Sequence, residues 1–303
     1  MSRSLTVVIP TRDRADYLGT ALASVAAAGE EARRRHGITT SAIVVDDCSD
    51  DDGATARVAE LWGARYHRIT EHDGRNDPGQ AILAGLGMVD SELFQLLGDD
   101  DALLPFALTC AAELVDEGAD LVSPSFWRTT PDLRPTRLVV VEQPDLGDLA
   151  RGYSTVCDVS VMRTELAHAY PFDVSLEAVM LLPFWVHLAL EQRTFVTTSY
   201  PTWLYRRHDA NISATVSDEA RALRARVVAD LQAQVVARLG ALPPSPHEDA
   251  EAAKAAREAE QEAARAEKER LAAERAEAAA QRAARNKRLD RRIRGKIART
   301  LAP

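Results

Sequence analysis

Short apolar runs alternate with helical patterns over the first 125 residues, and this alternation constrains the fold more than any other feature. Residues 5–9, 42–45 and 93–97 are largely apolar runs, which are typical of strands buried on both faces of a sheet. Between them lie segments with apolar side chains at helical spacing. Strands that alternate with helices predict βαβ units, so we expect an α/β fold with a mostly parallel sheet flanked by helices.

The chain divides into four parts by composition. We expect one α/β domain over 1–215 and a packing helix over 216–240, in which apolar side chains recur every fourth residue. A Pro-rich linker over 241–247 follows. Residues 248–303 are rich in Ala, Glu and Arg, which predicts a C-terminal charged helical tail.

The charged tail changes character towards its end. Over 248–281, Leu271 is the only large apolar side chain, which favours a single solvated helix over a coiled coil. Residues 282–303 hold nine Lys or Arg and one Asp, with an apolar side chain every fourth residue. This basic amphipathic pattern leaves two interpretations open, contact with an anionic membrane surface or a tail that stays in water.

Net charge and cysteine content narrow the function classes. The whole chain has net charge −9, so the body without its basic tail is strongly acidic, which argues against a nucleic-acid partner. The three cysteines are widely spaced and form no CxxC pair, which fits a reducing compartment. No apolar run reaches the roughly 18–20 residues that cross a bilayer. We therefore expect a cytoplasmic protein, with contact at the inner face of the membrane as an open alternative.

Polar residues follow three of the predicted strands. Residues 10–12 follow the first strand, 46–47 end the second, and 98–101 follow the fourth. In an open parallel sheet, ligands bind beyond the carboxyl ends of the strands, so we expect these residues to meet there. The chain contains neither a GxGxxG turn nor a GxxxxGK(S/T) loop, which argues against a dinucleotide oxidoreductase and a P-loop NTPase.

The three consecutive aspartates Asp99, Asp100 and Asp101 are the sharpest signal. Carboxylates crowded at the end of a buried strand repel one another, and a divalent cation such as Mn²⁺ or Mg²⁺ resolves that cost. The alternative is helix capping and first-turn charge. Asp46 and Asp47 have the same ambiguity between a helix cap and a contact to a nucleobase or ribose. Matching acids after two strands favour ligand binding.

Three segments together resemble the nucleotide-binding motifs of family 2 glycosyltransferases of the GT-A fold. They are 6–14 (TVVIPTRDR), 43–50 (IVVDDCSD) and 97–101 (LGDDD), in the family's order and spacing. The resemblance covers residues 4–215. It implies a sugar-nucleotide donor, most often UDP-linked, inversion at the anomeric carbon, a nucleotide-binding half over 1–125 and an acceptor half over 126–215.

By position, the resemblance also assigns roles to single residues. It implies that Pro10, Thr11 and Arg12 line the pocket for the base and ribose. Asp47 resembles the acid that contacts uracil, with Asp46 beside it.

The remaining assignments concern the diphosphate and the metal. Asp99 and Asp100 resemble residues that contact ribose and help to hold the cation, and Asp101 resembles a ligand of the cation that bridges the diphosphate. Segment 205–213 (YRRHDANIS) resembles a late family segment, which implies that Arg206 and Arg207 clamp the diphosphate and that His208 adds a metal ligand. A solvated loop is the alternative.

The sequence departs from the family where an inverting enzyme carries its base. Met180 and Leu181 fall where a Glu-Asp pair is expected, and neither side chain accepts a proton. Glu177 lies four residues before Leu181, so on a predicted helix over 177–191 it shares the same face. Glu177 is therefore our first candidate for the catalytic base and Asp173 the second, although a solvated carboxylate and an N-cap explain them equally well.

These observations predict a metal-dependent, inverting glycosyltransferase. It would move a hexose or N-acetylhexosamine from a nucleotide sugar to a hydroxyl of a glycan, a lipid-linked precursor or a small molecule. The missing Glu-Asp pair supports a second hypothesis, a catalytically inactive relative that binds a nucleotide sugar or a partner. A structural coiled-coil protein with a degenerate head is a third.

Overall fold

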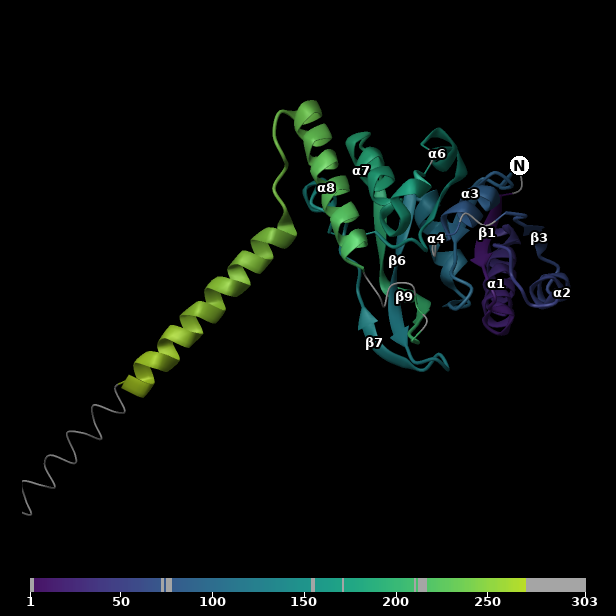
Figure 1. The fold of residues 1–303 in the computed structure, drawn as a ribbon, viewed down its shortest axis with the longest axis horizontal. Helices are drawn as coiled ribbons and strands as arrows, with labels where there is room; N and C mark the ends of the chain where they lie inside the picture. Colours follow the sequence, from purple (N-terminus) through teal and green to yellow (C-terminus); the bar gives the residue numbers. More distant parts are fainter. Residues whose placement is uncertain are drawn as a thin grey trace, which may run out of the picture. The chain divides into compact units, whose positions relative to one another are not determined.

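The computed structural model describes residues 3–71, 74, 78–153, 156–170, 172–209, 211 and 217–270. The chain splits into two units, Met1–Pro246 and His247–Pro303. The first unit is an α/β domain built on one sheet (Figure 1). In the second unit the described residues, 247–270, are helical, and from residue 248 onward all are exposed. The basic segment 282–303 lies outside the described residues.

One mixed sheet runs through the first unit, in the order β3-β2-β1-β4-β8-β6-β9-β5, with β7 paired to β6. The strands are β1 (Ser4–Thr11), β2 (Thr39–Asp46), β3 (Arg65–Arg68), β4 (Leu93–Leu96), β5 (Ala102–Leu103), β6 (Leu121–Thr129), β7 (Pro135–Val139), β8 (Val161–Arg163) and β9 (Phe195–Arg206). Strands β1 to β4 pair in parallel, whereas β8 pairs antiparallel with both β4 and β6. The expected parallel sheet is therefore present in the first half, and the second half is mixed.

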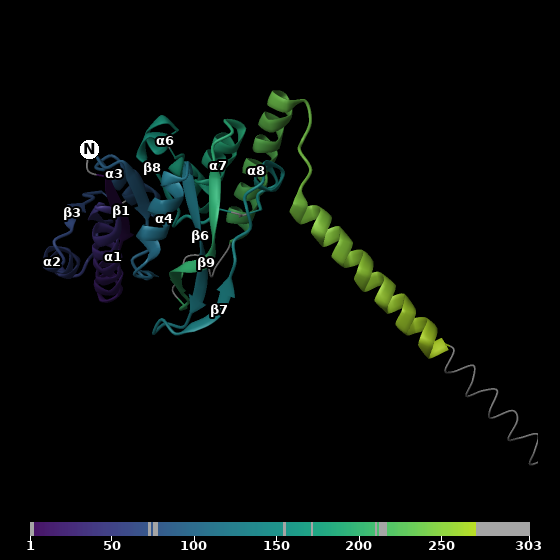
Figure 2. The same cartoon turned by 180° about the vertical axis from the view of Figure 1, so that it is seen from behind.

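Helices cover both faces of this sheet (Figure 2). They are α1 (Ala15–His36), α2 (Ala54–Leu61), α3 (Gly79–Leu86), α4 (Ala107–Asp116), α5 (Leu146–Ala150), α6 (Thr164–Ala169), the 3₁₀ helix η1 (Val174–Val179), α7 (Leu182–Leu190) and α8 (Asp218–Leu239). Alternate residues of β1 enter different cores: Val7 and Ile9 pack with α1 and α4, while Val8 packs with α3. Burial on both faces explains the continuous apolar run of this strand.

The predicted helix over 177–191 differs from the structure. It is interrupted, because η1 ends at Val179 and α7 begins at Leu182. Pro183 lies in the first turn of α7, a position that proline tolerates because no helical N–H is needed there.

Residues 243–245 of the segment expected as a linker belong to the first unit and are hydrogen-bonded within it. The guanidinium of Arg151 donates a hydrogen bond to the carbonyl of Pro243 (2.9 Å), and the Ser245 hydroxyl donates to Asp148 (2.5 Å). Before it, α8 begins at the capping side chain of Ser217 and buries Val227, among others. Within the described ranges, no helix is both long and apolar enough to cross a membrane.

Helix α3 packs so closely on the sheet that only glycine fits at position 85. A Cβ added to Gly85 would lie 2.4 Å from Val8 Cγ1 and 3.0 Å from Val45 Cγ2. We expect Gly85→Ala to lower the free energy of unfolding by about 1–3 kcal/mol, as overpacking of a core does. Gly87→Ala is the matched control, because its nearest contacts would be 3.5 Å away and its φ is −62°. Equal denaturation midpoints for the two variants would contradict this prediction.

Candidate functional site

The three polar strand ends meet at one edge of the sheet. Strand β1 lies between β2 and β4 and pairs with both in parallel. The Asp47 N–H donates to the carbonyl of Thr11 (2.9 Å), and the Thr11 hydroxyl donates to Asp99 Oδ2 (2.7 Å). The residues singled out by sequence at 10–12, 46–47 and 99–101 are therefore neighbours in the folded chain.

Asp100 joins two segments that are far apart in the sequence. Its Oδ2 accepts from Arg14 Nη1 (3.2 Å) and Asn211 Nδ2 (3.4 Å) and lies 2.9 Å from His208 Nε2. Arg14 also donates to Asp99 Oδ1 (3.3 Å). The carboxylates thus lie between a basic residue after β1 and a polar loop after β9.

Asp101 has a different environment from its two neighbours. Its Oδ2 accepts from the Trp203 indole N–H (2.9 Å), and its Oδ1 accepts from the backbone N–H of Arg206 (2.8 Å). Burial, followed by the charge of Asp100, raises the pKa of Asp101 well above its ordinary value. Asp101 ties the end of β4 to β9.

Asp99 is also difficult to ionise in the folded protein. Burial raises its pKa to about 6, and Asp100 contributes in the same direction, while Thr11 and Arg14 oppose the shift. Loss of hydration disfavours the charged carboxylate, and an added cation at this edge would favour it.

Arg206 and His208 pack on one aromatic ring. The Arg206 guanidinium lies 4.8 Å from the ring centroid of Tyr17, and the His208 imidazole stacks on the same ring at 5.1 Å. Arg206 also donates to the carbonyls of Asp100 and Pro131, whereas its buried Nη2 has no hydrogen-bond partner among the described residues. These contacts hold a cationic side chain beside the aspartates.

Arg207 and Arg12 differ from Arg206 in exposure. Arg207 is exposed and lies over the ring of Tyr205 at 5.8 Å. Arg12 is about half-exposed and forms an ion pair with Asp13 (Nε–Oδ2 3.7 Å). Both cations can reach solvent next to the site, in contrast to the buried guanidinium of Arg206.

The paired acids after β2 have separate environments. Asp46 accepts from the Ser49 N–H (2.7 Å) and the Tyr66 hydroxyl (2.5 Å) and forms an ion pair with Arg68 (3.3 Å). Burial and the hydrogen bond to Asp46 raise the pKa of Tyr66 to about 12. Asp46 therefore orders the loop after β2, and Asp47, with Pro10, borders the edge where the strands end.

The two acids considered as the base lie in or next to η1. Asp173 caps η1, because its Oδ1 accepts from the Ser175 N–H (3.0 Å) and hydroxyl (2.6 Å). Glu177 has φ +50°, so it is not part of a helix that includes Leu181. The shared helical face expected for Glu177 and Leu181 is absent from this structure.

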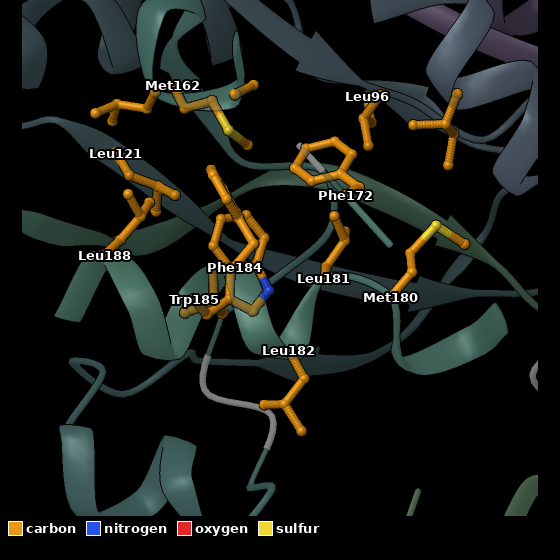
Figure 3. Packing of buried hydrophobic residues seen from close by; sticks show 14 of the residues in the cluster. Leu96, Leu121, Met162, Phe172, Met180, Leu181, Leu182, Phe184, Trp185 and Leu188 are labelled. Carbon is orange, nitrogen blue, oxygen red and sulfur yellow. The ribbon is translucent and has the colours of Figure 1, made fainter. Parts of the chain in front are cut away.

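Met180 and Leu181 are core residues, 5% and 7% exposed. Figure 3 shows Leu181 directed towards Phe172, among the carbon atoms of the apolar cluster. A Glu-Asp pair in these two positions would place carboxylates against that apolar surface, which costs free energy without a partner. Met180 and Leu181, which replace the expected Glu-Asp pair, therefore pack in the apolar core.

Sequence reasoning did not assign a role to four residues of the site, namely Arg14, Tyr17, Trp203 and Asn211. Arg14 and Asn211 fall inside the quoted segments 6–14 and 205–213, so the signal for them was present. Tyr17 and Trp203 carry no such signal, because single aromatic residues at regular spacing are more often core residues.

The carboxylates and the imidazole at this edge bear on whether a divalent cation can be held there. Among the described residues, no group of three or more His, Cys, Asp or Glu side chains is arranged to hold a metal ion. Asp100 and His208 nevertheless place a carboxylate and an imidazole 2.9 Å apart. Two protein ligands fit a Mg²⁺ or Mn²⁺ ion that takes its other ligands from substrate phosphates and water.

Comparison with known proteins identifies the family. The profile described as "Glycosyl transferase family 2" matches residues 6–162, which include all three motifs that follow the strands. The chain belongs to glycosyl transferase family 2. No curated protein sequence matches the chain in a direct comparison.

Solved structures with the same fold include fragments of S. aureus TarS. TarS 1–349 in complex with UDP has a TM-score of 0.59 at 19% identity, over 81% of this chain and 68% of that one. The complex with UDP-GlcNAc has a TM-score of 0.59 at 17% identity, over 81% and 69%. A longer TarS structure gives 0.57 at 20% identity, over 75% of this chain but only 39% of TarS. This family 2 glycosyltransferase therefore has the GT-A fold.

Proposed function

We propose that this family 2 glycosyltransferase moves a hexose or N-acetylhexosamine from a UDP-linked donor to an acceptor hydroxyl, with inversion. The observation that carries the proposal is the group formed around Asp100, where acids after β4 meet Arg14 and the loop after β9. The TarS fragment with the same fold was crystallised with UDP and with UDP-GlcNAc, which supports the choice of nucleotide.

The edge formed by β1, β2 and β4 would bind the nucleoside. Pro10, Thr11 and Arg12 would line the base and ribose pocket, and Asp47 would accept an N–H of the base. Asp46 would support that contact indirectly, because its carboxylate already orders the loop after β2.

Asp100 and His208 would hold the cation. Asp99 would contribute indirectly, because Arg14 donates hydrogen bonds to both Asp99 and Asp100. When bound, a divalent cation offsets the negative charge that develops on the departing diphosphate. Asp101 would act mainly by keeping β9 in place, since both of its oxygens accept protein hydrogen bonds. In this proposal Asp100, and not Asp101, is the main protein ligand of the cation.

Arg206 and Arg207 would offset the remaining charge of the diphosphate. The guanidinium of Arg206 is fixed by two carbonyls and by the Tyr17 ring, so little side-chain entropy is lost when an anion binds. Arg207 is exposed and would close on the diphosphate from the solvent side.

The displacement itself needs a base for the acceptor hydroxyl. Glu177 and Asp173 remain candidates from the sequence, and they are compared with a third carboxylate below. The buried Met180 and Leu181 favour one rival function, a protein that binds the nucleotide sugar without turnover.

Calorimetry with UDP and Mn²⁺, beside an assay of UDP release from UDP-sugars, tests the proposal. Saturable binding that requires Mn²⁺, together with turnover, is the expected result. Binding without turnover would favour the inactive relative, and no binding of UDP would contradict both functions.

The acceptor and the location are proposed from the sequence. A glycan or lipid-linked acceptor on the cytoplasmic side would suit a basic tail, residues 282–303, that contacts anionic lipid. Cosedimentation of the full chain with vesicles of phosphatidylglycerol and phosphatidylcholine, compared with phosphatidylcholine alone, measures that contact.

A further inference from the structure

We propose that Asp158 is the base that deprotonates the acceptor hydroxyl, an inference that rests on the proposed glycosyl transfer. Asp158 lies in neither of the segments from which a base was expected. It precedes β8, a strand that pairs with the middle of the sheet.

The pairing of β8 brings Asp158 to the edge where the aspartates lie. Gln95 of β4 pairs with Val161 of β8 in antiparallel register, and the Gln95 side chain donates to the carbonyl of Val159 (2.7 Å). Since the strands are antiparallel, β8 begins at the edge where β4 ends, and residues 157–160 form a turn there, closed by the hydrogen bond from the Ser160 N–H to the Cys157 carbonyl (3.1 Å). Asp158 lies in this turn, at the carboxyl end of β4.

Asp158 lines a small hollow whose other walls are mostly apolar. Leu182 and Trp185 of α7 contribute to it, as do Leu181 just before α7 and Arg224 of α8. The hollow has a volume of about 40 Å³. One water molecule needs roughly 10–15 Å³ on the same measure. A single acceptor hydroxyl, or a water in its place, fits beside the carboxylate.

The same hollow contains one of the two positions at which the sequence resemblance implies a Glu-Asp pair. Leu181, which precedes α7, occupies that position and lines the hollow. The carboxylate that lines the hollow is instead that of Asp158, from the turn before β8. Glu177 and Asp173 do not line this hollow.

The Asp158 carboxylate has no structural task that competes with proton transfer. Within the part of the chain that the structure describes, it has no hydrogen bond and no ion pair. Asp173, by comparison, caps η1 with both a backbone and a side-chain hydrogen bond. A carboxylate that is exposed to a hollow and not engaged by the protein is free to accept a proton from a substrate.

The surroundings of Asp158 also suit a base at neutral pH. Asp158 is an exposed residue that lines the hollow. Partial loss of hydration beside the surrounding protein raises its pKa to about 6. Among the described residues that line the hollow or adjoin Asp158 in the chain, the charged or titratable groups are Arg224 and Cys157. Burial raises the pKa of the Cys157 thiol to about 12, so that neighbour stays neutral.

The step is a single displacement. As the acceptor oxygen forms its bond to the anomeric carbon, its proton passes to an oxygen of Asp158. The bond from the anomeric carbon to the diphosphate breaks, and its electron pair leaves on the diphosphate oxygen. The proton on Asp158 then returns to water, which restores the carboxylate.

The test compares Asp158→Asn with the wild type, using the full chain with Mn²⁺. We expect UDP release from UDP-glucose, UDP-galactose or their N-acetylhexosamine equivalents, with water as acceptor, to fall at least about 100-fold. UDP affinity by calorimetry should stay within about twofold, because general base catalysis takes no part in nucleotide binding. Asp90→Asn is the matched control, since Asp90 is exposed and precedes β4 at the opposite edge of the sheet.

A second variant separates a base from a structural residue. Leu181→Asp, introduced into Asp158→Asn, should restore part of the lost turnover by supplying a carboxylate from another wall of the same hollow. The wild-type rate should rise with pH up to about 6 and then level, and Asp158→Asn should lose that rise.

Each outcome bears on one of the two proposals. If Asp158→Asn keeps full turnover, Asp158 is not the base and the proposed glycosyl transfer is unaffected. The same conclusion follows if Glu177→Gln or Asp173→Asn loses turnover while Asp158→Asn keeps it. Absence of both UDP binding and turnover in the wild type removes the transferase itself. Wild-type binding without turnover overturns the base and favours the inactive relative.

Discussion

Asp100→Asn should lower turnover of the UDP-sugar about 10³-fold, the largest loss expected from a single site residue outside the base. The asparagine keeps the volume of the side chain but removes the charge that faces Arg14 and His208. It also replaces one acceptor oxygen by an amide nitrogen, so either a metal ligand or a partner of Arg14 is lost. Loss of one preorganised electrostatic contact typically costs 10²–10³-fold, and here the metal ligand is lost as well.

The Mn²⁺ dependence of UDP binding shows how much of the lost turnover comes from the metal site. The concentration of Mn²⁺ that gives half-maximal UDP binding should rise by at least about tenfold in Asp100→Asn, as it does when metal-site partners are removed. Asp209→Asn is the matched control, because Asp209 is exposed and is adjacent to His208 in the chain. Equal Mn²⁺ dependence in Asp100→Asn and the wild type would remove Asp100 from the metal site.

His208→Ala offers an independent check on the same pair. If Asp100 and His208 share the cation, the double variant should lose little more UDP affinity than either single variant, because residues in one site are not additive. Independent losses that add would indicate that His208 acts elsewhere, for example through its stacking on Tyr17.

Local patterns were sufficient to predict the edge of the sheet at which the acids meet. The apolar run of β1 and the acids at 46–47 and 99–101 are short-range signals, and parallel strands place their carboxyl ends together. The pairing of β8 with β4 and of β9 with β6 was not predictable in the same way. Those pairs join residues more than sixty positions apart, and nothing in the local sequence fixes their register.

The same limit applies to the division of labour among the three aspartates. In the sequence Asp99, Asp100 and Asp101 are chemically equal, and their roles are set by donors from β1 and β9. Trp203 lies 102 positions from Asp101, and its indole decides that Asp101 faces the protein interior. Similarly, Tyr66 distinguishes Asp46 from Asp47.

The break between η1 and α7 shows how a helical pattern can mislead. Apolar spacing over 177–191 is compatible with one helix, but Pro183 would lie in the interior of such a helix, where its missing N–H breaks the hydrogen-bond ladder. The structure instead begins α7 at Leu182, so that Pro183 lies in the first turn, and Glu177 takes a positive φ. The helical pattern therefore predicted a base one turn before Leu181, whereas the carboxylate that lines the hollow comes from the turn before β8.

Asp101→Ala should destabilise the fold more than it impairs metal binding. The substitution leaves the Trp203 indole N–H and the Arg206 backbone N–H buried without acceptors. At about 1–3 kcal/mol for each unsatisfied buried donor, the two donors lower the free energy of unfolding by about 2–6 kcal/mol. Part of this loss is recovered because burial of the carboxylate was itself costly.

Urea denaturation of Asp101→Ala, Trp203→Phe and the double variant measures this link. Trp203→Phe removes one donor, so Asp101→Ala should cost less in that background, and the difference gives the coupling between the two side chains. The Mn²⁺ dependence of UDP binding, measured below the onset of unfolding, should stay close to that of the wild type. If Asp101→Ala instead keeps its stability and loses Mn²⁺-dependent binding, Asp101 is a metal ligand, as the motif first suggested, and the role proposed for Asp100 must be shared with it.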